Sequence, residues 1–298
     1  MKKFKTILRH YITKDTLLIF VKGMFMGIAD IIPGVSGGTI ALITGIYERL
    51  VHSLSRINLR FIPRFFKRDF DGAKRSIRDI DFQLFIPLII AIGLAIFLMS
   101  NVIGYFLDNH EAATYAFFFG LILASAFLLF GKIDGLSAKV MLFAIAGFLI
   151  GFFFTGLNTL QIGDSESVAL PIVFLSGMIA ICAMILPGIS GAFILVLLGM
   201  YDYMIDVLRD LKFLEIFVFM IGALIGILAF SRVLDRVLRK YKSYTLAFLI
   251  GLMLGTLRLL YQDITESMVS IVPVVISGLL GFCIIIILLL LRRRVEAS

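Results

Sequence analysis

A short motif, Pro-Gly-x-Ser-Gly, interrupts an apolar stretch of the chain at two places, and no other feature of the sequence limits the fold as strongly. The first copy occupies residues 33–37 and the second residues 187–191, 154 positions later (187 − 33). Proline has no backbone N–H and is accepted in the first turn of a helix, and serine is a frequent N-cap. Each copy therefore predicts that one helix ends and another begins inside an apolar segment.

The apolar segments around the motif are long enough for a membrane protein. Of the 298 residues, 60% are hydrophobic and 16% are charged, and the mean hydropathy is +1.06. Several runs reach the ~20 residues that a helix needs to cross a hydrocarbon core of about 30 Å. We therefore expect an all-α polytopic membrane protein. The net charge of +8 lies in the loops between apolar runs, which is typical of cytoplasmic loops and does not indicate a nucleic-acid partner.

The helices are expected in two groups. The first group, residues 1–157, has a hairpin at 16–48 with limbs 16–31 and 34–48, and spans at 82–107, 112–130 and 139–157. The second group, residues 158–298, has a hairpin at 168–205 with limbs 168–185 and 188–205, and spans at 213–234, 245–261 and 269–291. At 1.5 Å per residue each hairpin limb is at most about 27 Å long, which favours re-entrant hairpins over full crossings.

The two groups repeat one pattern. Residues 45–48 (Gly-Ile-Tyr-Glu) correspond to 199–202 (Gly-Met-Tyr-Asp) at the offset of 154, and Gly120-Leu121 corresponds to Gly251-Leu252 at an offset of 131 (251 − 120). A hairpin and three crossings place the second group upside down relative to the first. This predicts the inverted repeat of secondary transporters, in which the two breaks converge on a binding site near the midplane.

The charges of the loops alternate and predict that both termini are cytoplasmic. The net basic segments are the N-terminal segment, 49–81, 131–139, 232–244 and the C-terminal tail. The net acidic loops are those around 108–111, 164–166, 202–210 and 263–266. Positively charged loops remain preferentially in the cytoplasm, so this alternation supports the proposed order of crossings.

The motif places helix N-termini inside the membrane, where backbone N–H groups and the helix dipole favour an anion such as phosphate. The expected substrate-binding residues are Ser36, Gly37, Gly38 and Thr39 of the first copy, together with Ser190 and Gly191 of the second. The second copy has Ala192 and Phe193 in place of Gly38 and Thr39, so the more polar first copy is the stronger candidate. A kink with close helix packing is the alternative explanation.

Charged side chains within the apolar segments are further candidates, because a charge at the centre of a membrane helix costs roughly 2.5–3.5 kcal/mol. Arg258 and Lys22 are expected to pair with an anionic headgroup, and Asp30 and Glu48 to bind a coupling proton or sodium ion. The alternatives are snorkelling for the two bases, capping for Asp30 and an interfacial position for Glu48. The histidines, among them His52, receive no role, and no cofactor or metal is expected.

Taken together, these features resemble the polyprenyl-phosphate transporter family. The resemblance rests on the doubled motif, on the Gly-x-Tyr-acid turns after it and on the Gly-Leu-x-x-(Ala/Gly)-(Ser/Thr) segments at 120–125 and 251–256, and it covers nearly the whole chain. It implies a flippase of the bacterial plasma membrane, not an enzyme. Its substrate would be undecaprenyl phosphate, a polyprenyl phosphate lipid that is returned from the outer to the inner leaflet for reuse in cell-wall synthesis. The surrounding membrane lipids would be its other partners.

Two other functions stay open at this point. An undecaprenyl-diphosphate phosphatase also resembles this chain in having re-entrant hairpins and a Pro-Gly-x-Ser motif. That motif continues with Arg and Ser, however, whereas here Gly37-Gly38 or Gly191-Ala192 follow, and no Glu-x-x-x-Glu pair lies in an apolar segment. An ion- or proton-coupled small-anion transporter would share the fold and the site. A lipid carrier also needs a lateral opening for the tail, which the phenylalanines of 117–130 and 152–154 could line.

Overall fold

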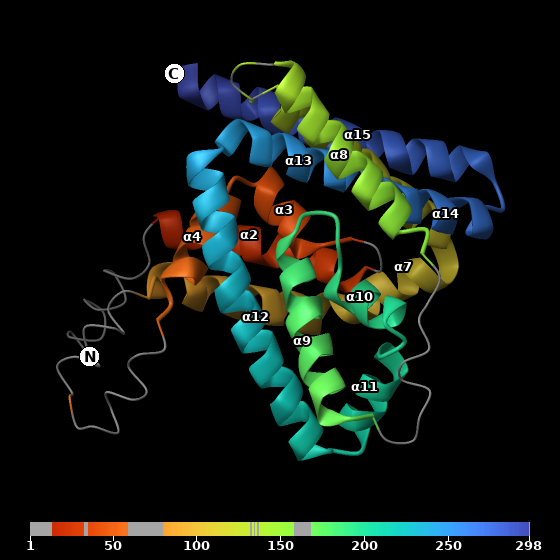
Figure 1. Cartoon of the computed structure of the whole chain (residues 1–298). Coiled ribbons are helices and arrows are strands. Elements are labelled where there is room, and N and C mark those ends of the chain that lie inside the picture. Colours follow the sequence, from red (N-terminus) through yellow and green to blue (C-terminus); the bar gives the residue numbers. More distant parts are fainter. Residues whose placement is uncertain are drawn as a thin grey trace, which may run out of the picture.

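The computed structural model describes residues 14–32, 35–58, 69, 80–131, 133, 135, 137–157 and 168–297, and in these ranges the only regular secondary structure is helical. The all-α class is thus confirmed (Figure 1). The helices are α2 (Lys14–Ile31), α3 (Gly37–Ile43), α4 (Tyr47–Arg56), α7 (Phe82–Phe130), α8 (Ala138–Phe154), α9 (Leu170–Ile185), α10 (Gly191–Leu197), α11 (Tyr201–Arg209), α12 (Phe213–Lys240), α13 (Lys242–Gly255), α14 (Leu257–Ser267) and α15 (Ile271–Ala297).

Both copies of the motif separate two helices. In the first half α2 ends at Ile31 and α3 begins at Gly37, and in the second half α9 ends at Ile185 and α10 begins at Gly191. Pro33 and Gly34 themselves lie outside the described residues. The helix breaks therefore occur where the two Pro-Gly-x-Ser-Gly copies predict them.

The second limb of each hairpin was predicted as one helix, and this was wrong. Gly45 (φ 74°) and Gly199 (φ 66°) adopt left-handed backbone conformations, which glycine reaches without steric cost and which end a right-handed helix. Each limb is therefore divided, into α3 and α4 or into α10 and α11, and the latter pair is bent by 110°. As a result α4 continues to Arg56, past the expected end of the hairpin.

The helix α7 contains two of the expected spans, joined by a sharp turn. His110 has non-helical angles (φ −142°, ψ 41°). The Thr114 hydroxyl donates a hydrogen bond to the carbonyl oxygen of Phe106, eight residues earlier, at 3.3 Å. Eight residues of a straight helix span about 12 Å, so the chain must fold back at His110. We call the parts before and after this residue the first and second segments of α7.

The second half shows two departures from the expected spans. The helix α12 runs on to Lys240, past the expected boundary at 234, and the span at 245–261 is formed by α13 and α14, which meet at Thr256. By length and composition, three described helical segments could cross a membrane, namely Phe82–Phe130, Phe213–Lys240 and Lys242–Ser267, or four if the bent pair α10 and α11 is one span. The helices α8 and α9 and the part of α15 up to Ile287 are apolar but shorter.

The helices pack in four close pairs. In the first pair α2 contacts the first segment of α7, and in the second α9 contacts α12. The other two pairs join the halves: α15 packs on the second segment of α7, and α13 packs on α8. Glycines line all four contacts, so the backbones approach closely, as small residues permit in membrane helices. Two short helices position the site: α3 packs on α2, and α10 packs on α9.

Candidate functional site

The two copies of the motif touch each other. The N–H of Gly188 in the second copy donates a hydrogen bond of 2.7 Å to Oγ1 of Thr39, whose side chain is completely buried. A Cβ at Gly38 would lie 3.1 Å from the carbonyl oxygens of Met184 and Ile185, so the absence of a side chain helps α3 to approach the end of α9 closely. Segments about 150 residues apart in the chain are thereby held together.

The N-terminus of α3 is already occupied by a carboxylate of the same chain. Oδ1 of Asp30 accepts a hydrogen bond of 2.7 Å from the N–H of Gly37. The Ser36 hydroxyl oxygen accepts from the N–H of Gly38 at 3.2 Å, and Ser36 is 1% exposed. A side-chain carboxylate thus fills the position that an anion would take at this helix start. The first copy of the motif is closed and satisfied internally.

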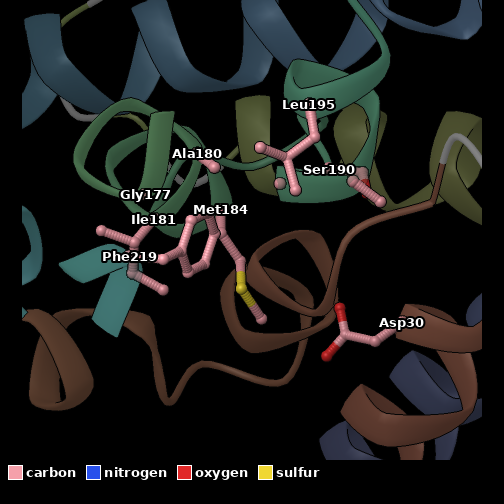
Figure 2. A pocket seen from close by; sticks show the side chains of 10 residues that line it. Asp30, Gly177, Ala180, Ile181, Met184, Ser190, Leu195 and Phe219 are labelled. Atoms are coloured by element: carbon pink, nitrogen blue, oxygen red, sulfur yellow. The ribbon is translucent and has the colours of Figure 1, made fainter. Parts of the chain in front are cut away.

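The second copy borders a cavity of about 260 Å³. Asp30 from α2 and Ser190 and Gly191 from the start of α10 contribute polar groups to it, and α9, α10 and α12 contribute its mainly apolar remainder: Gly177, Ala180, Ile181, Met184, Ala192, Leu195 and Phe219. Figure 2 shows Asp30 and Ser190 toward one end of the cavity and Phe219 toward the other. No basic side chain of the described residues lines it.

The start of α10 offers hydrogen-bond donors to this cavity. The Ser190 side chain makes no capping hydrogen bond, in contrast to Ser36. No described residue accepts a hydrogen bond from the N–H of Gly191 or Ala192, whereas the N–H of Ile194 is bonded to the Ser190 carbonyl. Unbonded N–H groups and a free hydroxyl are suitable ligands for phosphate oxygens. The open part of the site is therefore at the second copy, although the sequence favoured the first.

The two basic candidates lie away from the cavity. Nη1 of Arg258 donates a hydrogen bond of 2.9 Å to the carbonyl oxygen of Phe152, and its guanidinium lies 4.6 Å from the centre of the Phe152 ring. Lys22 is partly buried on α2, eight residues before Asp30 and thus about 12 Å along the helix. Neither side chain is in direct contact with the space between Asp30 and α10.

Glu48, the second candidate for ion coupling, is paired at the surface. Its carboxylate lies 2.8 Å from Nζ of Lys242, and about half of each side chain is exposed. Both residues line a different pocket, beside Tyr47 and Leu129. Of the predicted site residues, the structure therefore brings Asp30, Ser190 and Gly191 together around one cavity. Ser36, Gly37, Gly38 and Thr39 are buried and do not line this cavity.

Comparison with known proteins shows to which family the chain belongs. The profile of a family described as VCA0040-like, undecaprenyl phosphate translocase-like, matches residues 26–272 of the chain. The chain belongs to this family. The match begins just before Asp30 and ends past α14, so it includes both copies of the motif and the whole cavity. No solved structure matches the chain.

Two relatives of the translocase-like family are similar over most of their length. A polyprenyl-phosphate transporter of Vibrio cholerae is 40% identical over 245 residues, which is 82% of this chain and 77% of the relative. A polyprenyl-phosphate transporter of Staphylococcus aureus is 31% identical over 280 residues, which is 89% of this chain and 93% of the relative. The resemblance inferred from the doubled motif is thus confirmed. The family is one of multi-pass membrane transporters and not of enzymes, which excludes the phosphatase alternative.

Sequence reasoning missed the apolar walls of the cavity. Met184, Leu195 and Phe219 enter it from three different helices. One signal pointed to this region, because Gly177 corresponds to Gly23 at the repeat offset of 154 (177 − 23), and Gly177 lines the cavity. The apolar residues around Gly177 carry no signal of their own in a chain that is 60% hydrophobic.

Proposed function

We propose that this chain carries undecaprenyl phosphate from the outer to the inner leaflet of a bacterial plasma membrane, with the phosphate bound between Asp30 and the start of α10. The single observation that carries the site is the cavity in which a free Ser190 hydroxyl and unbonded N–H groups face a membrane-embedded carboxylate. Membership in the translocase-like family and the names of both relatives support the substrate.

In this proposal the two copies of the motif have different tasks. Ser190 and the N–H groups of Gly191 and Ala192 bind phosphate oxygens directly. The first copy supports them from behind, because Thr39 fixes the Gly188 N–H and the N–H groups of Gly37 and Gly38 are already bonded. The cost of burying the phosphate is lowered by hydrogen bonds to its charged oxygens, each of which contributes about 1.5–3 kcal/mol.

Asp30 makes binding of the phosphate depend on a proton or a cation. Two negative charges about 4 Å apart at an effective dielectric constant of about 20 repel each other by about 4 kcal/mol. The lipid therefore binds well only when Asp30 is protonated or shielded by sodium. Moving one negative charge inward against the membrane potential costs about 2.3 kcal/mol per 100 mV, and a proton carried on Asp30 would cancel this charge.

The inverted repeat, with residues 1–157 and 158–298 as its halves, remains a proposal that several paired observations support. The turn at His110 corresponds to one at Tyr241 (φ −134°, ψ 47°), 131 positions later (241 − 110). The bond from Thr114 to Phe106 corresponds to one from Thr245 to the Val237 carbonyl, also 3.3 Å. The four helix pairs follow the same symmetry, since α2 with the first segment of α7 matches α9 with α12.

The proposed arrangement also suggests on which side of the membrane the termini lie and what Arg258 and Lys22 do. If the face with the basic loops is cytoplasmic, the proposed inverted pair of halves would have both termini in the cytoplasm. Thr256 lies close to the second copy of the motif, because a Cβ at Gly188 would meet its hydroxyl group, and Arg258 follows two residues later. We assign Arg258 and Lys22 to neutralising the headgroup on its way to and from the cavity, and not to the bound state.

A lipid substrate is favoured over a small anion by a second groove. Residues of α7, α8 and α13 surround an apolar space of about 350 Å³, lined among others by Phe127, Phe130 and Phe148. An apolar space of this size has no use for a small anion, whereas a polyprenyl tail needs apolar surface along its path. The groove agrees with the lateral opening expected from the phenylalanines of 117–130.

The function is tested by reconstituting the purified protein in liposomes with a labelled polyprenyl phosphate in one leaflet. The wild type should accelerate exchange between leaflets, and Ser190→Ala and Gly191→Leu should slow it. Thr265→Ala, which changes a surface hydroxyl on α14, is the matched control and should behave as the wild type. Acceleration of small-anion uptake without lipid exchange would support the small-anion alternative instead.

A further inference from the structure

The helix α4, which follows the first hairpin, is bound to the second half of the chain by polar contacts. Nδ1 of His52 lies 3.2 Å from Oδ1 of Asp235 on α12. Nε of Arg239, one turn later on α12, lies 3.0 Å and 3.1 Å from the two oxygens of the same carboxylate, and Nη2 of Arg239 lies 2.9 Å from Nε2 of His52. The three side chains form one cluster across the two helices.

A second set of contacts adds to this cluster. Glu48 at the start of α4 pairs with Lys242 at the start of α13 at 2.8 Å. Nη2 of Arg232 on α12 donates to the carbonyl oxygen of Ile57, the residue after α4, at 3.0 Å. We use the name α4 latch for the side chains of Glu48, His52, Asp235, Arg239 and Lys242. The latch joins residues 183 to 194 positions apart, and α4 and α12 also pack closely along it.

Within the part of the chain that the structure describes, the opposite end of the molecule has no such latch. Under the repeat offsets of 154 and 131, Glu48 and His52 correspond to Asp202 and Asp206 on α11. Lys242 corresponds to Glu111, just after the turn of α7 at His110, and Arg239 corresponds to Asp108, just before it. All four counterparts are acidic, so the pairs that attract at one end would repel at the other.

The contacts of α11 agree with this difference. Asp206 pairs at 3.2 Å with Arg209 of its own helix, and Asp210 pairs with Lys212 at 3.7 Å, just before α12. Among the described residues, no ion pair joins α11 to α7, and these helices lack the close packing of α4 with α12. The two ends of the repeat are therefore in different states: one is closed by the latch and the other is not.

We call the side of the protein with the net basic loops the basic face and the side with the net acidic loops the acidic face. We propose that the α4 latch is the gate that closes the basic face of the transporter, and that the structure shows the state open toward the acidic face. A carrier with one central site must expose it to one face at a time, and two equivalent halves can exchange their contacts to do so. Opening the basic face breaks the latch, while the acidic counterparts keep α11 and α7 from forming the same pairs. The pairs are partly exposed, hence weak enough to break in every cycle. This gate rests on the proposed transport function.

The test measures from which face the cavity can be reached. In a background of Cys182→Ser and Cys283→Ser, an Ala192→Cys reporter lines the cavity. A membrane-impermeant maleimide is added from either side of sealed vesicles. Labelling of an Arg56→Cys variant, exposed at the end of α4, identifies the basic face independently of topology.

With the latch intact, the reporter should react faster from the face opposite Arg56. The double variant Glu48→Gln, Asp235→Asn should raise labelling from the basic face about threefold, as expected for losing weak ion pairs. The charge swap Glu48→Lys, Lys242→Glu should keep wild-type labelling, which also shows that such variants fold. Asp15→Asn is the matched control, since it breaks an exposed pair with Arg49 inside the first half.

The gate is refuted if the double variant labels as the wild type does, or if Asp15→Asn shifts labelling equally. These outcomes are separate from the proposed function, which is measured as lipid exchange by the wild-type protein, without the Ala192→Cys reporter, in parallel proteoliposomes. If the wild type exchanges lipid but the latch variants label as the wild type does, only the gate is overturned. A shifted labelling pattern without any lipid exchange supports the gate and overturns the proposed substrate.

Discussion

The backbone N–H of Gly188 donates its hydrogen bond to Oγ1 of Thr39, 149 residues earlier in the chain, at 2.7 Å. Through this bond the polar break of one hairpin fixes the backbone of the other. Gly188 has φ 88°, a conformation that residues with a Cβ rarely adopt, so this bond depends on a glycine in the second break.

Removing this acceptor should affect both stability and transport. Thr39→Val keeps the volume of the side chain and leaves the Gly188 N–H without its partner, at a cost of about 1–3 kcal/mol. We expect a lower midpoint of thermal unfolding in detergent and slower lipid exchange. Thr44→Val is the matched control, because Thr44 bonds only to carbonyls of its own helix. An unchanged midpoint for Thr39→Val would mean that the contact between the two breaks is not needed.

The two serines of the motif should differ when each is replaced by alanine. Ser190→Ala removes a free donor from the cavity and should weaken binding of polyprenyl phosphate about tenfold, with little change in stability. Ser36→Ala removes a buried cap and should lower stability by about 1 kcal/mol, with less effect on affinity. Binding titrations and thermal unfolding measure the two effects. The reverse pattern would place the phosphate at the first copy.

Asp30 should determine how transport responds to pH. Because the carboxyl group of Asp30 must be neutral when the phosphate enters, the wild-type rate of lipid exchange should fall when the pH is raised on the side of the membrane that the net acidic loops face. Asp30→Asn keeps an acceptor for the Gly37 N–H but cannot titrate, so its exchange should lose most of this dependence. Proteoliposome assays over a pH series provide the comparison. If Asp30→Asn retained the pH and sodium dependence of the wild type, the coupling group would lie elsewhere.

Equivalent glycines should show equivalent costs if the halves are inverted repeats. A Cβ at Gly281 would meet the carbonyl of Phe117, and a Cβ at Gly147 would meet the carbonyl of Phe248, 131 positions after Phe117 (248 − 117). Alanine at either site should destabilise the protein by roughly 1–3 kcal/mol. Gly104→Ala meets nothing within 4 Å and serves as the control. Strongly unequal losses at Gly281 and Gly147 would speak against the symmetry.

Much of the fold could be predicted from local patterns, because its signals are local. In Pro-Gly-x-Ser-Gly the proline ends one helix and the serine occupies the N-cap position of the next, so both breaks were found. The turn at His110 lies within the acidic loop expected at 108–111. The segments at 45–48 and 199–202 were recognised as turns, but the division of each second limb into two helices at Gly45 and Gly199 was missed, since an isolated glycine in an apolar segment fits both a continuing helix and a turn.

The site was harder to predict, because its geometry depends on contacts between distant segments. The sequence named both Asp30 and Ser190, which the structure places around one cavity, and it ranked the first copy of the motif above the second. The polar residues of the first copy turned out to satisfy one another and Asp30. Likewise, nothing in one sequence pairs Glu48 with Lys242, which are 194 positions apart.

The most direct test of the whole account is the rate of leaflet exchange of a labelled polyprenyl phosphate in proteoliposomes with an imposed proton gradient. The account predicts that the wild type accelerates exchange well above protein-free liposomes and that Ser190→Ala with Gly191→Leu returns the rate close to the background. Wild-type protein that is folded and inserted, yet gives no acceleration under either a proton or a sodium gradient, would contradict it.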